Sequence, residues 1–153
     1  MLTQDKNGIW ASDTKPKDIS FPDSGYSDCM SIEDKSFWFN HRHKIIELMI
    51  SKFKFNHNLA DIGWGNGFNL FKLEKNYLNN NCFLVEPGYQ GCLNAKLRGA
   101  KHVYNTVFQD LDFKKLNIDG ACLFDVIEHV EDDLSFMQEL RDKLPKGSLI
   151  YIT

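Results

Sequence analysis

The chain has 153 residues, of which 42% are hydrophobic and 25% charged, the size and composition of one globular domain. Its 21 acidic residues outnumber its 18 basic ones, the net charge is −3, and only three of the basic residues are arginine. This balance argues against nucleic acid as the main partner. No apolar run has the length of a membrane-spanning helix, so no membrane contact is expected.

The four cysteines are far apart and form no CxxC pair. This spacing favours reduced thiols over a disulfide framework or a zinc site, and predicts a cytoplasmic protein. The first residues also lack the basic start and apolar stretch of a signal peptide.

Residues 1–30 are predicted to be an irregular arm, because Gly, Pro, Asp and Ser interrupt any apolar register. A helix is predicted over 31–50, where Ser31 can serve as N-cap and apolar side chains recur at steps of three and four. The core, 55–153, alternates short apolar runs with helical segments. Strands are expected at 59–62, 82–85, 101–105, 121–126 and 148–152, and helices at 66–78, 90–97 and 132–144.

This alternation predicts βαβ units and a mostly parallel α/β sheet of about five strands, in a domain spanning 31–153. The arm and the N-terminal helix would precede the core. The last expected strand would lie at an edge of the sheet, where exposed backbone groups favour pairing into a homodimer.

A glycine-rich turn follows the first strand of the core. In DIGWGNG (61–67), Gly63, Gly65 and Gly67 allow a tight turn and a close approach to a ligand, because glycine has no Cβ. The next helix presents free N–H groups, which suit an anionic group. Glu86 ends the following strand, where a carboxylate can accept both hydrogen bonds of a ribose diol.

The spacing of the glycines narrows the choice of cofactor. The dinucleotide pattern GxGxxG needs a glycine where Phe68 stands, so a nicotinamide oxidoreductase is not favoured. No GxxxxGK[ST] run is present, which excludes a P-loop.

Together with four later runs, the turn resembles the class I S-adenosylmethionine-dependent methyltransferases. The matching runs are DIGWGNG (61–67), FLVEP (83–87), FQDLDF (108–113), GACLFDVIEHVED (120–132) and LPKGSLIYIT (144–153). The resemblance covers about residues 55–153 and implies a Rossmann-like three-layer αβα sandwich. It is nearest to small-molecule members such as ubiquinone-pathway enzymes, and SFWFNHR (36–42) is similar to an N-terminal helix of some bacterial members.

The resemblance assigns roles to residues of the turn and of the next strand end. Asp61, Gly63, Gly65 and Gly67 would hold the methionine end of S-adenosyl-L-methionine, with Asp61 accepting from the amino group. Glu86 would take the ribose hydroxyls. Trp64 is bulkier than the usual residue between the glycines.

Further roles follow from the other runs. Asp110 would accept from the adenine amino group, and Phe124 and Asp125 would lie under the sulfonium. Trp38 and Arg42 would close the site, with Arg42 near the cofactor carboxylate. Plainer interpretations stay open, since Asp110 fits a solvated loop and Trp38 fits a core.

His129 is the predicted general base for a hydroxyl or amine acceptor, with Asp125 as the second catalytic candidate, although His129 also fits a plain helix start. The run DVIEH (125–129) is also similar to the ExxEH motif of some methyltransferases, in which carboxylates and an imidazole hold Mg²⁺ or Mn²⁺. Its first acid is Asp instead of Glu, so no metal is expected.

The predicted function is transfer of a methyl group from S-adenosyl-L-methionine to a small-molecule, sugar or metabolite acceptor. The family's sheet has seven strands, and its last two are not found in this sequence. The alternative is therefore an S-adenosylmethionine-binding module that is inactive or depends on a partner.

Overall fold

The structure is a computed structural model that describes residues 2–12, 22–55, 57–76 and 81–153. Its strands, α-helices and 3₁₀ helices (η) follow one another as β1 (Leu2–Gln4), β2 (Trp10–Ser12), α1 (Asp23–Ile32), α2 (Phe37–Lys52), β3 (Asn58–Ile62), α3 (Phe68–Asn76), β4 (Cys82–Val85), α4 (Tyr89–Arg98), β5 (His102–Asn105), η1 (Phe108–Asp110), β6 (Ile118–Leu123), η2 (Ile127–His129), α5 (Asp133–Lys143) and β7 (Leu149–Ile152).

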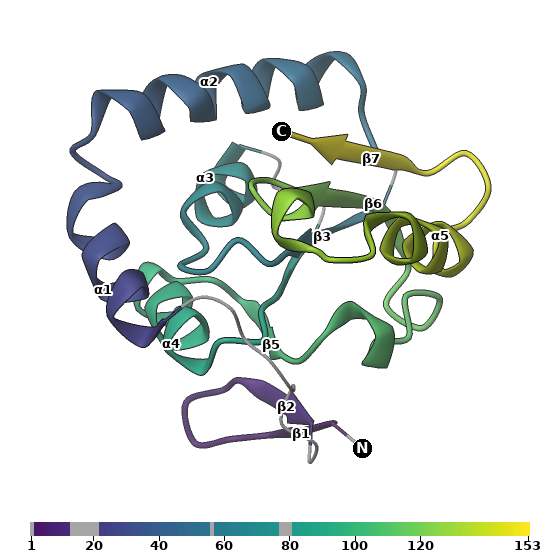
Figure 1. Cartoon of the computed structure of the whole chain (residues 1–153), viewed down its shortest axis with the longest axis horizontal. Helices are drawn as coiled ribbons and strands as arrows, with labels where there is room; N and C mark the ends of the chain where they lie inside the picture. Colours follow the sequence, from purple (N-terminus) through teal and green to yellow (C-terminus); the bar gives the residue numbers. More distant parts are fainter. Residues whose placement is uncertain (1, 13–21, 56, 77–80) are drawn as a thin grey trace.

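The strands form one sheet in the order β1-β2-β5-β4-β3-β6-β7, in which only β1 and β2 pair antiparallel. Helices α2, α3 and α4 cover one face, and α5 with η1 covers the other (Figure 1). This arrangement confirms the predicted Rossmann-like αβα sandwich with a mostly parallel sheet.

The sheet has seven strands instead of about five, because the arm predicted to be irregular contributes two of them. β2 pairs in parallel with β5, and Trp10 stacks on Tyr104 with ring centroids 6.3 Å apart. Ile9, next to β2, is fully buried. Three-residue strands are too short to show an alternating pattern, and residues 13–21 of the arm lie outside the described residues.

The single helix predicted over 31–50 is also wrong, since two helices occupy this region. α1 begins within the arm and ends at Ile32, and α2 begins at Phe37. Ser36 caps α2, accepting a hydrogen bond from the Phe39 N–H at 3.5 Å, whereas the Ser31 hydroxyl donates to a carbonyl of α1. The break between the helices turns the Glu33 side chain into the interior.

The strand predicted over 121–126 begins and ends earlier, at Ile118 and Leu123. Asp125 has a φ of +53°, a left-handed conformation that cannot continue a strand. Phe124 and Asp125 therefore belong to the loop after β6. The helix predicted over 66–78 begins at Phe68, and its predicted end lies outside the described residues.

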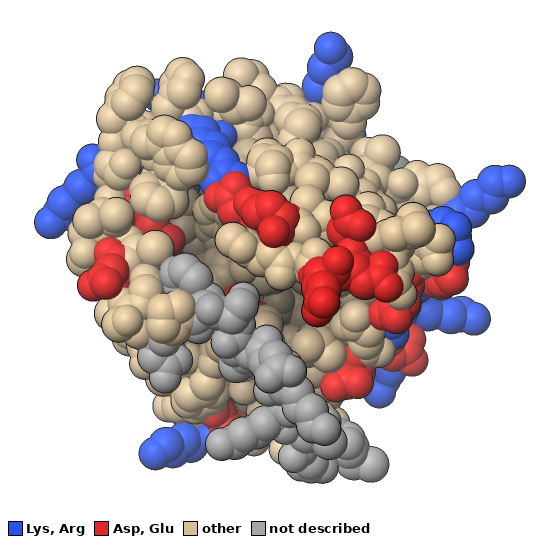
Figure 2. Space-filling view, viewed as in Figure 1, with Lys and Arg blue, Asp and Glu red and all other residues tan. Residues whose placement is uncertain are grey.

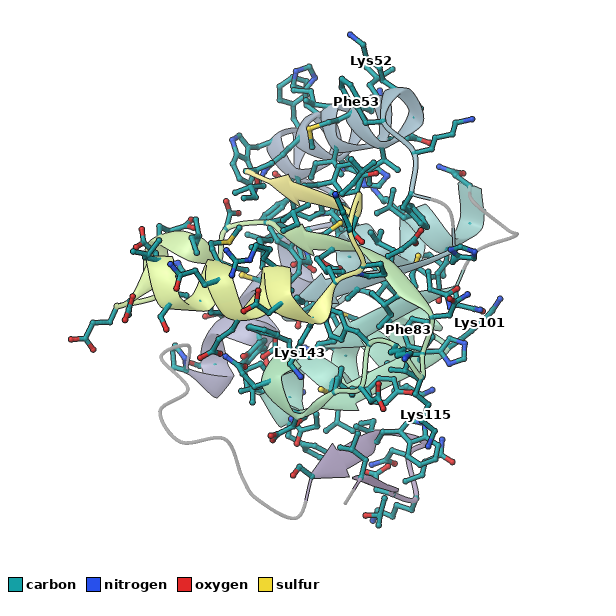
Figure 3. The ribbon with its side chains drawn as sticks, turned by 90° about the vertical axis from the view of Figure 1, so that its right-hand side faces the viewer. Lys52, Phe53, Phe83, Lys101, Lys115 and Lys143 are labelled. Atoms are coloured by element: carbon teal, nitrogen blue, oxygen red, sulfur yellow. The ribbon has the colours of Figure 1, made fainter. Side chains whose placement is uncertain are left out.

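Side chains of the strands alternate between two hydrophobic clusters, one on each face of the sheet. Leu59 and Leu84 point towards α2, α3 and α4, whereas Ala60 and Phe83 point towards η1 and α5. Figure 3 shows Phe83 within the molecule, while Lys52, at the end of α2, extends from the surface. None of the helices in the described ranges combines the length and apolar character needed to cross a membrane.

Candidate functional site

The carboxyl ends of β3, β4 and β6 meet at one edge of the sheet. Asp61 on β3 lies beside Leu84 of β4 and Cys122 of β6 in the strand register. Because these strands are parallel, the loops after them also emerge together. The structure thus brings together the glycine turn, Glu86 and the loop that begins with Phe124.

The turn adopts a conformation that requires its glycines. Gly63, Gly65 and Gly67 have φ angles of +75°, +46° and +66°, which side chains disfavour. A Cβ on Gly67 would also lie 2.8 Å from the Cβ of Ala95. The turn therefore packs directly on α4 and leads into the first residue of α3.

Asp61 lies beneath this turn and is completely buried. Neither carboxylate oxygen has a hydrogen-bond partner among the residues that the structure describes. Burial, reinforced by the nearby charge of Glu86, raises the pKa of Asp61 to about 7. A buried acid without a donor is costly unless a positively charged or donating group meets it.

Glu86 follows β4 and is 2% exposed. Its Oε1 accepts hydrogen bonds from the Tyr26 hydroxyl at 2.8 Å and the Gly88 N–H at 2.6 Å. Its Oε2 accepts from the Gly65 N–H at 2.8 Å, which ties the second strand end to the glycine turn. Burial raises the pKa of Glu86, and these three hydrogen bonds oppose the rise.

Tyr26 is a site residue that the sequence analysis did not identify. It lies on α1, which packs against α4 (Figure 1), and its ring contacts Gly65, Gly88 and Gly91. In the sequence, Tyr26 is one residue of the segment 1–30 that is predicted to be an irregular arm. The small residues at the start of α4 are the one local signal that a bulky group is accommodated there.

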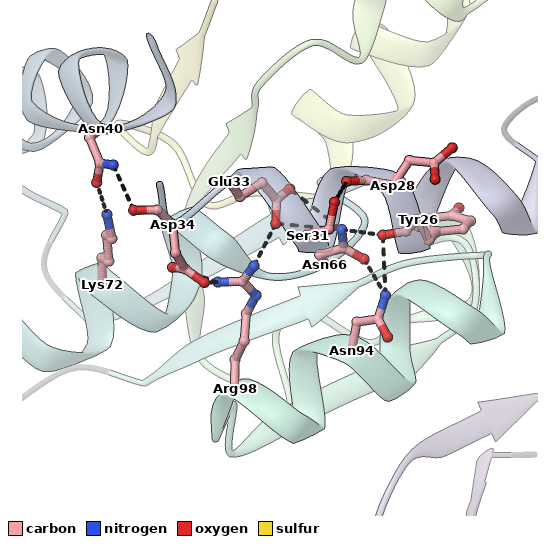
Figure 4. A network of polar contacts seen from close by, with 10 residues as sticks. All are labelled: Tyr26, Asp28, Ser31, Glu33, Asp34, Asn40, Asn66, Lys72, Asn94 and Arg98. Carbon is pink, nitrogen blue, oxygen red and sulfur yellow. Dashed lines mark hydrogen bonds and ion pairs between the residues drawn. The ribbon is translucent and has the colours of Figure 1, made fainter. Parts of the chain in front are cut away.

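A buried polar network fixes α1 over the turn (Figure 4). The Tyr26 carbonyl accepts from Asn66 Nδ2 at 2.8 Å and Asn94 Nδ2 at 3.4 Å. Further along, Glu33 Oε2 pairs with Arg98 Nη2 at 2.7 Å, and both side chains are buried. The network joins α1 to Asn66 of the glycine turn and to α4.

The Arg42 guanidinium, predicted near the cofactor carboxylate, forms a bidentate pair with Asp125. Its Cζ lies 5.0 Å from the ring centroid of Trp38 and 4.8 Å from that of Trp64. Trp64 also makes an edge contact with the buried Phe124, with centroids 5.9 Å apart. These five residues therefore form one cluster at the glycine turn: Trp38, Arg42, Trp64, Phe124 and Asp125.

Among the described residues, neither Asp110 nor His129 has a hydrogen bond, ion pair or ring contact with this cluster. Asp110 is exposed on η1 and accepts from the Thr106 hydroxyl at 3.4 Å, and His129 is exposed on η2. Acidic side chains gather around η2 and the start of α5 (Figure 2). The exposed acids of this region are Asp125, Glu128, Glu131, Asp132 and Asp133.

The DVIEH run does not form a metal centre within the described part of the chain. No group of three His, Cys, Asp or Glu side chains comes together there in a way that could hold an ion. Asp125 is instead engaged by Arg42.

Several solved structures have a similar fold. A putative S-adenosyl-L-methionine-dependent methyltransferase from Methanococcus maripaludis matches with a TM-score of 0.71 and 16% identity, over 91% of this chain and 66% of its own. The plantazolicin methyltransferase BpumL, solved with a pentazolic desmethylPZN analog and SAH, matches with a TM-score of 0.67 and 19% identity, over 87% of this chain and 53% of its own.

A third match is a chain from the complex between the Haloferax volcanii Trm112 methyltransferase activator and the putative methyltransferase. It has a TM-score of 0.64 and 17% identity, over 85% of this chain and 57% of its own. This chain thus spans about half to two thirds of the length of these structures. No curated protein matches it.

The family Methyltransf_11, described as "Methyltransferase domain", matches residues 60–152, which is more than half of the chain. The matched segment begins in β3 and ends in β7, so it includes the glycine turn, Glu86 and the loop after β6. The chain belongs to this family of methyltransferase domains, whose methyl donor is S-adenosyl-L-methionine.

Proposed function

We propose that this chain binds S-adenosyl-L-methionine at the glycine turn and transfers its methyl group to a small-molecule or sugar-like metabolite. The observation that carries the proposal is the carboxylate of Asp61. It is completely buried beneath the turn, and neither of its oxygens meets a donor among the described residues. An ammonium group, such as the one on the methionine part of the cofactor, would satisfy it.

The surrounding residues also fit this cofactor. Gly63, Gly65 and Gly67 give the turn a backbone that a ligand can approach closely. Glu86 lies at the next strand end, where an acid suits a ribose diol. Asp110 is the proposed partner of the adenine amino group, and the Arg42 guanidinium, beside the turn, suits the cofactor carboxylate.

When bound, the cofactor supplies a methyl group that its sulfonium has already activated. The chain must therefore orient the donor and the acceptor, and such orientation can contribute about 7–11 kcal/mol. Phe124 and Trp64 would provide an apolar wall that excludes water. We assign the acceptor's proton to His129, which is exposed beside this edge and accessible to a substrate.

The class of acceptor, the location in the cell and the oligomeric state are also proposals. The acceptor is a small metabolite and not a nucleic acid, since the chain carries an excess of acidic residues. We infer a cytoplasmic location from the four free cysteines. A homodimer through β7, which lies at an edge of the sheet, stays a prediction.

Titration calorimetry with S-adenosylhomocysteine tests the cofactor assignment. Asp61→Ala and Glu86→Ala should each weaken binding by about tenfold or more, because each removes a charged hydrogen-bond acceptor. Asp142→Ala is the matched control, since this exposed carboxylate lies on α5 and pairs with Arg141. Absence of binding by the folded chain would overturn the proposal.

Methyl transfer is then measured with a methyl-labelled donor and a panel of hydroxyl- and amine-bearing metabolites. His129→Gln should lower the turnover rate about a hundredfold without a comparable loss of S-adenosylhomocysteine affinity. An equal loss in both measurements would contradict the role of His129 as base.

A further inference from the structure

We propose that the Tyr26 hydroxyl takes the place of one ribose hydroxyl on Glu86, so that Tyr26 and the cofactor's ribose compete for this carboxylate. The inference rests on the proposed function, because it takes Glu86 as the acid that binds ribose. It makes Tyr26 a residue that sets cofactor affinity, although Tyr26 lies on α1, outside the segment that matches the family.

The hydrogen bonds on Glu86 leave too few acceptor positions for a ribose diol. A carboxylate has about four lone-pair positions for donors. Tyr26 and Gly88 take the two on Oε1, and Gly65 takes one on Oε2. One position is left, whereas two ribose hydroxyls need two. Both backbone donors belong to the turn and strand end, so the Tyr26 hydroxyl is the donor that can leave.

Burial leads to the same conclusion. Glu86 is 2% exposed and Tyr26 is 3% exposed. A ribose hydroxyl therefore gains access to Oε1 of Glu86 when the Tyr26 side chain that donates to this oxygen moves. Among the described residues, Tyr26 is the one whose side chain donates a hydrogen bond to the Glu86 carboxylate.

The space for the Tyr26 ring is built into the sequence of the opposing segment. A Cβ on Gly88 would lie 2.1 Å from the Tyr26 hydroxyl oxygen, and a Cβ on Gly91 would lie 2.8 Å from Cε1 of the ring. A Cβ on Gly88 would displace the Tyr26 hydroxyl, and a Cβ on Gly91 would clash with the ring and, also at 2.8 Å, with the carbonyl oxygen of Gly65. The close packing of the ring therefore holds the Tyr26 hydroxyl in position against Glu86.

The main chain of Tyr26 is held independently of its side chain. Asn66 and Asn94 donate to its carbonyl, and the Glu33–Arg98 pair holds the end of the same helix (Figure 4). Release of the hydroxyl therefore requires rotation of the side chain and leaves α1 in place. The exchange replaces one hydroxyl–carboxylate hydrogen bond by another, so the ribose gains less affinity than it would on a free acid.

The first test compares S-adenosylhomocysteine binding to the wild-type chain and to Tyr26→Phe by titration calorimetry. The variant keeps the ring and removes the competing donor, so binding should tighten by about tenfold. Tyr89→Phe is the matched control, because its hydroxyl also donates to a carboxylate, that of Asp5 at 2.6 Å, on the surface. It should leave the affinity unchanged.

The second test uses the 2′-deoxy and 3′-deoxy analogues of S-adenosylhomocysteine. In the wild-type chain, an analogue that lacks the exchanging ribose hydroxyl should bind less than about threefold more weakly, because Tyr26 then keeps its hydrogen bond to Glu86. In Tyr26→Phe, the same analogue should bind about tenfold more weakly than S-adenosylhomocysteine. This measurement on the wild-type chain decides the matter even if the variant fails to fold.

The outcomes separate the two proposals. Binding by wild type with unchanged or weaker binding by Tyr26→Phe overturns the competition and leaves the cofactor assignment intact. A tenfold penalty for both deoxy analogues in the wild-type chain overturns it as well. No binding by either chain overturns both proposals, whereas binding by Tyr26→Phe alone supports the competition.

Discussion

Arg42 and Asp125, which are 83 residues apart, form a bidentate ion pair at the carboxyl edge of the sheet, with Nη2 of Arg42 2.6 Å from Oδ1 of Asp125. The same guanidinium lies over the rings of Trp38 and Trp64. One side chain thus connects α2 with the glycine turn and with the loop after β6. Helix α2 is therefore part of the wall of the candidate site.

The Arg42–Asp125 pair should show direct energetic coupling. In a double-mutant cycle of Arg42→Ala and Asp125→Ala, urea unfolding should give a coupling of about 1 kcal/mol, because the Asp125 side chain is 44% exposed and partly screened. Arg42→Lys keeps the charge but lacks the planar fork, so it should recover less than half of the loss. Effects that add to within about 0.3 kcal/mol would rule out the coupling.

Gly67→Ala should destabilise the fold by more than about 2 kcal/mol, because the new Cβ would lie 2.8 Å from the Cβ of Ala95 at a φ of +66°. Gly147→Ala separates backbone strain from the clash. Gly147 has a φ of +89°, and a Cβ there would meet no atom of the described residues within 4 Å, so its loss should be about 1 kcal/mol. Equal losses in urea unfolding would show that packing on α4 contributes nothing.

Arg98→Met should cost about 3 kcal/mol of unfolding free energy, because it leaves the buried Glu33 carboxylate without its cation. Arg141→Met is the matched control, since Arg141 pairs with Asp142 on the surface and the change should cost less than about 0.5 kcal/mol. The double variant Arg98→Met with Glu33→Leu should regain much of the loss. A double variant less stable than Arg98→Met alone would contradict this account.

Stability should fall as pH rises between about 4 and about 7 through the contribution of Asp61. Its pKa is about 7 in the folded chain against 3.8 for the free side chain, so the folded state binds the proton more tightly. The stabilisation is complete below pH 3.8 and is lost as pH rises through 7, at up to about 1.4 kcal/mol per pH unit.

Urea unfolding of Asp61→Asn over the same pH range checks this prediction. The variant should lose most of the slope, while a smaller slope of the same sign stays, because burial also raises the pKa of Glu86. Asp112→Asn, which changes an exposed carboxylate, should keep the wild-type slope. An unchanged slope in Asp61→Asn would place the proton uptake elsewhere.

The sequence by itself determined the βαβ architecture, the glycine turn and the position of Glu86 after the next strand. These features are local, since periodicity, glycines and strand-ending residues are read within a few neighbouring positions. Parallel pairing then brings the strand ends to one edge whatever the details of the core. For this reason Asp61, Gly63 and Glu86 could be placed together from the sequence.

Only the tertiary structure decided which side chains meet Glu86 and Arg42, and where the N-terminal helices begin and end. Where α1 ends at Ile32, Glu33 is buried against Arg98, which lies 65 residues away in the sequence. Strands β1 and β2 exist because β5 offers an edge to pair with. Tyr26 meets Glu86 across 60 residues, and a contact at that separation depends on chain packing, which no local pattern encodes.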